Sequence, residues 1–261
     1  MKARMQVSQY IRFLLHSTSR FGIHSPFMYE LVTRVINDRQ GPEDLQEVEK
    51  IRKMLCRSDE IIRHTDFGAG HNGNIPVTGM TPLRRIARWS SVPPRYGRLL
   101  YRLVKHFQPE NILEIGTSLG ISTMYMSRAA GGSRIFTLEG CRNIAARAEE
   151  HFHALKMDNI QVHIGSFDHL LPVVLDEMQR VDLVFIDGNH RYSPTMRYFE
   201  MILPFTHNDS IFVFDDIYWS GGMQQAWKDI TKRATASVNL YKMGIVFMKK
   251  ELSRQEFCIR Y

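Results

Sequence analysis

The chain has 261 residues, enough for one α/β domain and an additional region of about 100 residues, and its 44% hydrophobic and 23% charged content excludes extensive disorder. No apolar run approaches the ~18 residues of a membrane helix, and three distant cysteines indicate neither a disulfide framework nor a cysteine zinc site. We expect a cytoplasmic protein without membrane insertion.

The net charge of +7 comes from the first 100 residues, which hold 16 Lys+Arg against 9 Asp+Glu. Because these basic residues are scattered, we expect a solvated basic surface rather than a nucleic-acid-binding one. Binding of an anionic substrate or partner remains the alternative.

Residues 1–90 are predicted to form a helical N-terminal region. The expected helices are Val7–His16, Phe27–Asn37, Glu43–Cys56 and Pro82–Trp89. Ser25 and Pro26 are typical of a helix start, as an N-cap followed by proline in the first turn. A glycine-rich stretch, Asp66–Asn74, resembles a nucleotide loop but lacks a following helix pattern, so we interpret it as a connecting loop over the active site. We consider three roles for this region. It binds the substrate, forms a lid over the active site, or mediates oligomerisation, for example into a homodimer.

Residues 91–261 alternate strand and helix signals, which is typical of a parallel sheet covered on both faces. The expected strands are Asn111–Ile115, Arg134–Leu138, Ile160–Ile164, Val181–Ile186, Ser210–Phe214, Ala236–Tyr241 and Ile245–Lys249. The expected helices are Ile121–Ala130, Arg142–Met157, Phe167–Gln179, Pro194–Leu203 and Met223–Ala234. Only three residues separate the last two strands, so these must form a hairpin. We predict an α/β, Rossmann-like, doubly wound, mostly parallel seven-stranded sheet with a C-terminal antiparallel hairpin.

The turn after the first of these strands is a candidate nucleotide site. Gly116 and Gly120 enclose a turn between a buried strand and a helix N-terminus, where α/β folds bind nucleotides. The spacing lacks the third glycine of the dinucleotide fingerprint, which disfavours a pyrophosphate. Glu114 stands beside the turn and suits a ligand with a cationic end. Glu139 ends the next strand, where a carboxylate accepts hydrogen bonds from ribose hydroxyls.

Over about residues 88–250, these features resemble the class I S-adenosylmethionine-dependent methyltransferases, and among them the O-methyltransferases of the catechol and caffeoyl-CoA type. The resemblance rests on the motifs Ser91–Leu100, Leu113–Ser122 and Gly165–Asp168 and on Glu139. It implies S-adenosylmethionine as the cofactor and a binding domain over residues 91–261. The implied contacts lie at the methionine end, the ribose and the adenine, and they come from Ser91, Val92, Glu114, Gly116, Ser118, Gly120, Ser122, Glu139, Gly140, Cys141, Ser166, Phe167 and Asp187.

Acidic residues follow the fourth and fifth strands of the predicted sheet. Asp187, Asp215 and Asp216 should converge at the carboxyl edge, and three carboxylates repel one another unless a cation joins them. The resemblance implies a divalent metal here, Mg²⁺ or another ion. The alternative is that Asp215 and Asp216 cap the next helix and bind water. His190 takes the place of the family's lysine as candidate general base, with Asp187 beside it. An Asp-Gly-x-His motif is also similar to that of sugar and natural-product methyltransferases.

The function that these residues predict is methylation of a hydroxyl group on a small molecule, with the acceptor unidentified. A nicotinamide-dependent oxidoreductase and a non-catalytic cofactor-binding or nucleic-acid-binding protein remain as alternatives. Trp219 is either a pocket wall or core packing. We expect His151 and His153 to be surface residues, since their i,i+2 spacing puts them on different faces of a helix.

Overall fold

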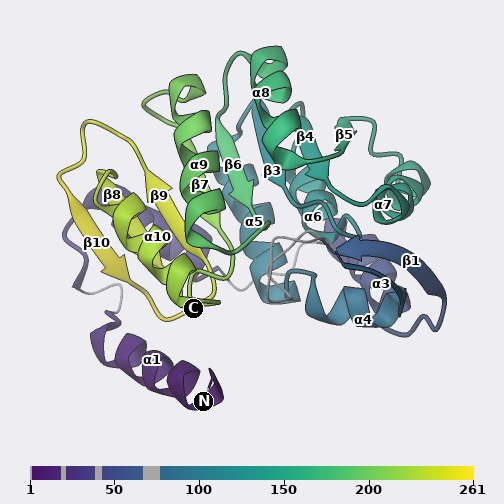
Figure 1. Cartoon of the computed structure of the whole chain (residues 1–261). Helices are drawn as coiled ribbons and strands as arrows, with labels where there is room; N and C mark the ends of the chain where they lie inside the picture. Colours follow the sequence, from purple (N-terminus) through teal and green to yellow (C-terminus); the bar gives the residue numbers. More distant parts are fainter. Residues whose placement is uncertain (1, 19–21, 39–42, 67–76) are drawn as a thin grey trace.

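The computed structural model describes residues 2–18, 22–38, 43–66 and 77–261 (Figure 1). At its centre is an eight-stranded sheet in the order β10-β8-β9-β7-β6-β3-β4-β5. The strands are β3 (Asn111–Ile115), β4 (Arg134–Glu139), β5 (Ile160–Ile164), β6 (Leu183–Ile186), β7 (Ile211–Phe214), β8 (Ala236–Asn239), β9 (Gly244–Phe247) and β10 (Gln255–Cys258). β3 to β7 run parallel, and β9 is antiparallel to both β7 and β8. The predicted Rossmann-like fold and its C-terminal hairpin are confirmed.

The predicted number of seven strands is wrong, because β10 adds an eighth strand parallel to β8. This strand is short, polar and only half-buried, so its sequence lacks the apolar run that marks the inner strands. Just beyond it, Ile259 forms a parallel bridge to Thr18, whose backbone N–H donates to the Cys258 carbonyl at 2.8 Å. Thr18 therefore lies beside the end of β10.

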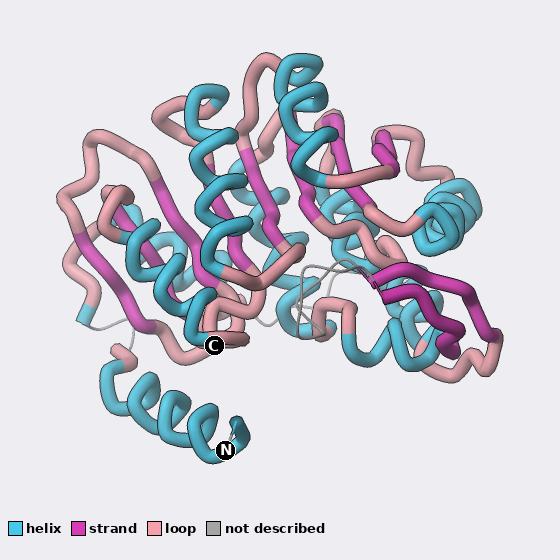
Figure 2. Tube along the Cα trace, in the orientation of Figure 1, coloured by secondary structure: helices cyan, strands magenta, loops and turns pink. Residues whose placement is uncertain are grey.

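Helices connect the strands and cover both faces of the sheet (Figure 2). The helices of the α/β part are α5 (Pro94–Phe107), α6 (Ile121–Ala129), α7 (Arg142–Ala154), α8 (Phe167–Met178), α9 (Tyr192–Ile202) and α10 (Gly221–Thr231). Alternate side chains of β6 enter different cores, since Leu183 and Phe185 pack with α5 whereas Val184 and Ile186 pack with α8, α9 and α10. This period of two is the geometry of a strand buried on both faces.

The N-terminal region begins with α1 (Lys2–His16), α2 (Pro26–Glu30) and the π-helical segment η2 (Leu31–Ile36). The predicted start at Ser25 is confirmed, because its hydroxyl accepts a hydrogen bond from the Met28 backbone N–H. The region continues with η3 (Glu43–Leu45), α3 (Gln46–Leu55) and α4 (Leu83–Trp89). In the described part of the chain, no helix is both long and apolar enough to cross a bilayer.

This region is not wholly helical, because β1 (Ile61–Asp66) and β2 (Val77–Pro82) pair as an antiparallel hairpin. The β-branched residues at the start of β1 favour an extended chain, and Ile62 is buried against α3 and α4. Of the predicted glycine-rich loop Asp66–Asn74, residues 67–74 lie outside the described residues, and Asp66 ends β1.

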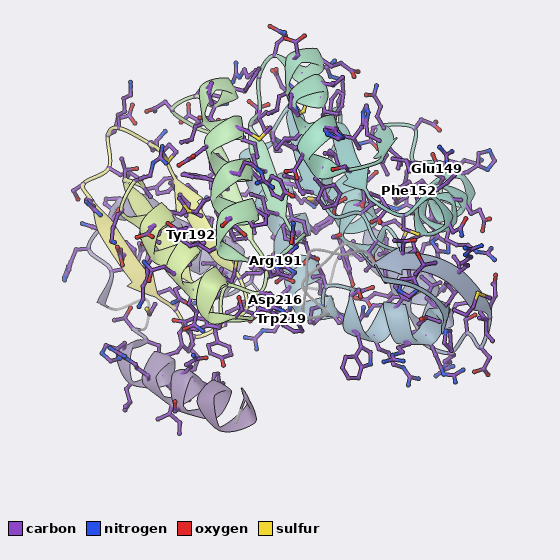
Figure 3. All side chains as sticks on the ribbon, viewed as in Figure 1. Glu149, Phe152, Arg191, Tyr192, Asp216 and Trp219 are labelled. Atoms are coloured by element: carbon purple, nitrogen blue, oxygen red, sulfur yellow. The ribbon has the colours of Figure 1, made fainter. Side chains whose placement is uncertain are left out.

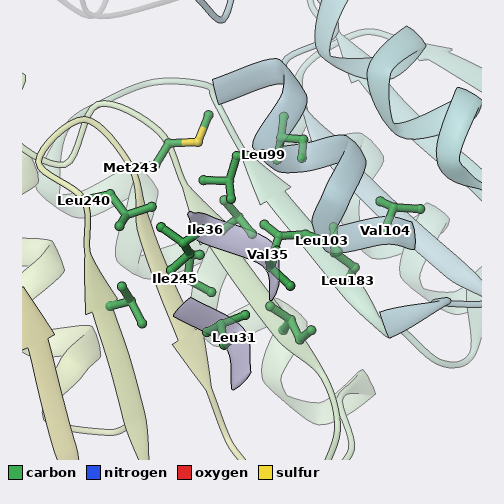
Figure 4. Packing of buried hydrophobic residues seen from close by; sticks show 14 of the residues in the cluster. Leu31, Val35, Ile36, Leu99, Leu103, Val104, Leu183, Leu240, Met243 and Ile245 are labelled. Atoms are coloured by element: carbon green, nitrogen blue, oxygen red, sulfur yellow. The ribbon is translucent and has the colours of Figure 1, made fainter. Parts of the chain in front are cut away.

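Two of the hydrophobic clusters join the N-terminal region to the α/β part. Leu31 and Val35 of η2 pack against Leu99 and Leu103 of α5, on one face of the sheet (Figure 4). α3, α4 and the hairpin β1–β2 share a second cluster with α6 and α7. α1 lies farther out, and its Tyr10 ring meets Tyr241 at 4.8 Å between centroids (Figure 1). In the described parts of residues 22–90, the buried side chains thus pack onto the helices and strands of the α/β part.

We expect Gly97→Ala to destabilise the fold, because a Cβ at this position would clash with the Tyr125 ring, where α5 crosses α6. Overpacking costs about 1–3 kcal/mol, while alanine gains about 1 kcal/mol of helix propensity over glycine. Urea unfolding should therefore show a net loss of stability. Gly131→Ala is the matched control, since an added methyl group there would have no other atom within 4 Å. A gain in stability for Gly97→Ala would contradict this packing.

Candidate functional site at the carboxyl edge of the sheet

The turn after β3 is packed directly against the end of β6. Gly116 has φ +105°, and a Cβ on it would lie 2.6 Å from the Asp187 carbonyl oxygen. Gly120 has φ +77°, and a Cβ there would lie 2.6 Å from the Phe152 ring of α7. Both positions therefore require glycine, because a side chain there would have a strained backbone and would meet Asp187 or Phe152.

Non-glycine residues with left-handed backbone also gather in the turns at this edge. They are Ser118 after β3, Asn189 after β6, Asp216 after β7 and Tyr241 between β8 and β9, with φ from 49° to 70°. Such conformations cost free energy and persist where the surrounding structure fixes them, often at functional sites. Their concentration here supports this edge as the site.

Glu139 bridges the turns that follow β3 and β4. Its Oε2 accepts the backbone N–H of Ser118 and its Oε1 accepts that of Cys141, both at 2.8 Å. Two backbone donors fix this half-buried carboxylate beside the glycine turn, in the position predicted for a ribose-binding acid.

Glu114 has a different environment from the one predicted. Its side chain is fully buried and accepts hydrogen bonds from Ser122, Thr123 and Thr137 at 2.5–2.6 Å. The hydroxyl of Ser122, one of the predicted cofactor contacts, donates to Glu114. Both side chains belong to the support beneath the turn.

The buried network changes the acidity of Glu114. Burial raises its pKa to about 7, although the three hydroxyl donors oppose the shift. A carboxyl without solvent contact favours its neutral form, because desolvation penalises the charge. The group thus titrates near neutrality inside the fold.

The other predicted cofactor positions line the same edge. Val92 is buried, and its carbonyl accepts a hydrogen bond from Arg52 of α3, next to Ser91. Gly140 and Cys141 follow β4, and the Cys141 sulfur accepts the Thr65 backbone N–H of β1 at 3.3 Å. Ser166 and Phe167 begin α8 after β5, and the Phe167 ring would lie 2.8 Å from a Cβ on Gly188. These positions come from three separate turns, one before α5, one after β4 and one after β5.

Asp187 and His190 form a pair after β6. His190 Nε2 lies 3.4 Å from Asp187 Oδ1, and both side chains are more than four-fifths buried. Burial raises the pKa of Asp187. At His190, burial acting by itself would lower the pKa. The nearby aspartates, Asp187 first, outweigh burial at His190 and raise its pKa above the ordinary value. The Trp219 ring lies 6.3 Å from the His190 ring and is half exposed, so Trp219 is not core packing (Figure 3).

Asp215 and Asp216 follow β7, and Lys242 joins them. The Lys242 Nζ donates to Asp215 Oδ2 at 2.9 Å and to Asp216 Oδ1 at 2.5 Å. Among the described residues, no three His, Cys, Asp or Glu side chains are arranged to hold one metal ion. Lys242 engages one oxygen of each aspartate, while Asp215 Oδ1 is buried and has no hydrogen-bond partner among the described residues. The metal site of Asp187, Asp215 and Asp216 stays a prediction. Burial raises the pKa of Asp215 well above its ordinary value.

Two side chains depart from the sequence interpretation. His151 is buried, and its Nδ1 lies 3.3 Å from the Leu119 carbonyl oxygen, so its prediction as a surface residue is wrong, whereas His153 is exposed. Lys242 is absent from the candidates that the sequence suggests, because it lies in the short turn between β8 and β9. A signal for it exists in the hairpin: β9 has to run antiparallel to its neighbours, which brings this turn to the carboxyl edge.

Residues 113–217 match a family described as a methyltransferase domain. A catechol O-methyltransferase of Niastella koreensis is 31% identical over 134 residues, covering 50% of this chain and 60% of that protein. A transmembrane O-methyltransferase homolog of Rattus norvegicus is 34% identical over 122 residues, covering 42% of this chain and 47% of its own. The chain thus spans less than two thirds of the length of these relatives.

Solved structures share the fold at low identity. An O-methyltransferase from Bacillus cereus in complex with S-adenosylhomocysteine has a TM-score of 0.57 at 19% identity, covering 84% of this chain and 96% of that one. A methyltransferase from Podospora anserina bound to S-adenosylhomocysteine has a TM-score of 0.60 at 15% identity, covering 87% and 98%. Both likenesses extend well beyond the segment matched by the family.

We expect the buried acid Glu114 to make the fold less stable as the pH rises. Its pKa is about 7 when folded and 4.5 when exposed, so the unfolded chain releases this proton first. The contribution is complete below pH 4.5, falls between pH 4.5 and 7, and amounts to about 3 kcal/mol. Glu114→Gln should gain stability relative to the native chain over this window in urea unfolding, whereas Glu149→Gln, on an exposed position of α7, should not. If the free energy of unfolding changed with pH in the same way for the native chain, Glu114→Gln and Glu149→Gln, this would contradict a raised pKa at Glu114.

Proposed function

We propose that this chain, whose residues 113–217 match the methyltransferase-domain family, transfers a methyl group from S-adenosylmethionine to a hydroxyl oxygen of a small molecule. One observation carries the proposal. Glu139 is held by the backbone N–H groups of Ser118 and Cys141 beside a glycine turn, as a ribose-binding carboxylate requires. A turn built for close backbone contact and an acid at its side suit a nucleoside without a pyrophosphate.

The residues at the edge fit this cofactor. Glu139 would hold the ribose hydroxyls, and Gly140 and Cys141 would lie against the adenine with Ser166 and Phe167. The main chain of Ser91–Val92 and of Gly116–Gly120, with the start of α6 at Ser122, would meet the methionine end. When bound, S-adenosylmethionine supplies a methyl group on a positively charged sulfur. The side chains of Glu114 and Ser122 act through the turn that they support, since they hydrogen-bond to each other.

His190 and Asp187 have the geometry of a general base with a carboxylate that orients it. A proton on Nε2, which faces Asp187 at 3.4 Å, leaves Nδ1 as the nitrogen with a lone pair. That nitrogen would take the hydroxyl proton as the acceptor oxygen attacks the methyl carbon. Trp219, half exposed and 6.3 Å from the His190 ring, would form a wall for a flat acceptor. Alignment of oxygen and methyl group would supply much of the rate enhancement.

Isothermal titration with S-adenosylhomocysteine tests the cofactor site. The native chain should bind it, and Glu139→Ala should weaken binding at least ~10-fold, since hydrogen bonds to a charged group contribute about 1.5–3 kcal/mol. Glu149→Ala is the control, because this exposed glutamate lies on α7 away from Asp216 and Trp219 (Figure 3). No binding by the native chain would refute the proposed function, and full binding by Glu139→Ala would refute the placement of the ribose.

Replacing His190 should slow turnover without loss of cofactor. With an acceptor found by screening hydroxylated small molecules, we expect His190→Gln to lower kcat about 10²–10⁴-fold, the usual contribution of a general base. Affinity for S-adenosylhomocysteine should stay unchanged. Because the pKa of His190 is raised, native kcat should increase with pH through a value above 6.5, and this step should vanish in His190→Gln. His153→Gln, at an exposed position, should behave as the native chain, and an unchanged kcat in His190→Gln would remove the base from this role.

A further inference from the structure

The helix α1 carries large apolar side chains on the side that faces away from the sheet. Ile11 is 52% exposed and Leu15 is 79% exposed. They are four residues apart, so they lie on the same side of the helix, and the exposed Arg12 lies beside them. Phe13, on the opposite side, is buried. The outer side of α1, defined by Ile11, Arg12 and Leu15, therefore combines aliphatic and cationic groups.

Contacts on the inner side of α1 fix its orientation. The rings of Tyr10 and Phe13 meet the Tyr241 ring, at 4.8 Å and 5.5 Å between centroids. Gln9 donates a hydrogen bond to Gln224 of α10 at 3.2 Å. Because these contacts join α1 to the turn between β8 and β9 and to α10, the outer side of the helix is held in a fixed direction.

The charged residues of α1 are all basic. The sequence of this helix contains Lys2, Arg4 and Arg12 and neither Asp nor Glu. The helix also belongs to the first 100 residues, from which the whole net charge of the chain comes. Cationic groups together with exposed aliphatic side chains are typical of helices that lie on anionic lipid surfaces.

The helix α4 presents similar groups at the same end of the molecule. Trp89 is 80% exposed, Arg85 and Arg88 of the same helix are exposed, and the helix contains neither Asp nor Glu. Figure 1 shows α1 and α4 at one end of the molecule and α8 at the opposite end. Tryptophan is enriched where proteins meet lipid headgroups, and the long side chains of arginine reach the phosphates there. Two separate contacts of this kind fit a broad surface.

We propose that α1 docks on the anionic surface of a lipid bilayer. Ile11 and Leu15 enter the boundary between headgroups and acyl chains, Arg12 pairs with lipid phosphates, and Trp89 of α4 gives a second contact. The helix lies in the plane of the surface and does not cross it, because its 15 residues are too few to span the hydrocarbon core. This docking adds a partner to the proposed methyl transfer and does not depend on it.

A second copy of the chain and a nucleic acid fit the outer side of α1 less well. Two copies that met through α1 would bring helices of the same positive charge together, and like charges repel. A nucleic acid would bind the basic residues through its phosphates but would leave Ile11 and Leu15 without an apolar partner. An anionic bilayer provides a partner for both kinds of side chain.

Co-sedimentation of the full chain with lipid vesicles tests the inference. The native chain should bind vesicles of phosphatidylserine and phosphatidylcholine in equal parts at least ~10-fold more tightly than vesicles of phosphatidylcholine alone, because several basic residues meet the anionic surface. Leu15→Glu should weaken binding to the anionic vesicles at least ~10-fold, since it removes a buried leucine and adds a negative charge. Arg12→Gln should weaken this binding about 5-fold.

Val173→Glu is the matched control, because Val173 is an exposed apolar residue of α8, at the end of the molecule opposite α1 (Figure 1). This variant should bind the anionic vesicles as the native chain does. Since Leu15 is mostly exposed, Leu15→Glu should unfold at the native temperature, so that a loss of binding reports on the outer side of α1.

The inference is overturned by a native chain that stays in the supernatant with anionic vesicles, or by a Leu15→Glu variant that binds them as tightly as the native chain. Without vesicle binding, a native dimer that Leu15→Glu makes monomeric would assign this side of α1 to a second copy. Binding of duplex DNA without vesicle binding would assign it to nucleic acid. Titration with S-adenosylhomocysteine is a separate measurement, so failure of the docking leaves the proposed methyl transfer in place.

Discussion

Glu114 is a carboxylate without solvent contact, and three hydroxyl groups hold it from two different elements. It belongs to β3, while its donors come from the first turn of α6 and from β4. The network therefore fixes the direction in which the chain leaves β3 and enters α6. Everything at the edge depends on that direction, because the turn between them packs on the end of β6 and positions Glu139 through Ser118. A buried network with all its hydrogen bonds made favours a single arrangement of β3, β4 and α6. Its burial also makes the Glu114 carboxyl harder to ionise.

The sheet then concentrates charge at one end. Parallel strands deliver their carboxyl ends to the same edge, where one acidic residue ends β4 and others follow β6 and β7. The antiparallel hairpin of β8 and β9 adds a cation to this edge. Because β9 runs opposite to β7, the turn before it brings Lys242 beside the carboxylates. His190 and Lys242 have raised pKa values for the same reason, since both face carboxylates in a partly desolvated place. The same carboxylates thus favour the protonated forms of both side chains.

The sequence predicted the inner strands β3 to β7 closely, because strands buried on both faces read as uninterrupted apolar runs with clear ends. It also predicted the glycine turn and the place of Glu139 beside it, because both follow from the chain order of local motifs. The misses depend on contacts between distant segments. The hairpin β1–β2 joins strands across a long connection, β10 is a polar edge strand, and His151 is buried only because α7 packs on the turn after β3. Lys242 belongs to this class too, since its partners are 26 and 27 residues away.

The outer border of the sheet shows one more consequence of these distant contacts. A bare edge strand exposes unpaired N–H and C=O groups that another chain can join, which is a route to aggregation. β8 avoids this because β10 pairs with it, and the bridge between Thr18 and Ile259 continues the pairing beyond β10. The segment after α1 and the segment after β9 thus shield each other and the sheet. Without β10, β8 would become the border strand of the sheet, and its backbone groups would be open to pairing with a second molecule.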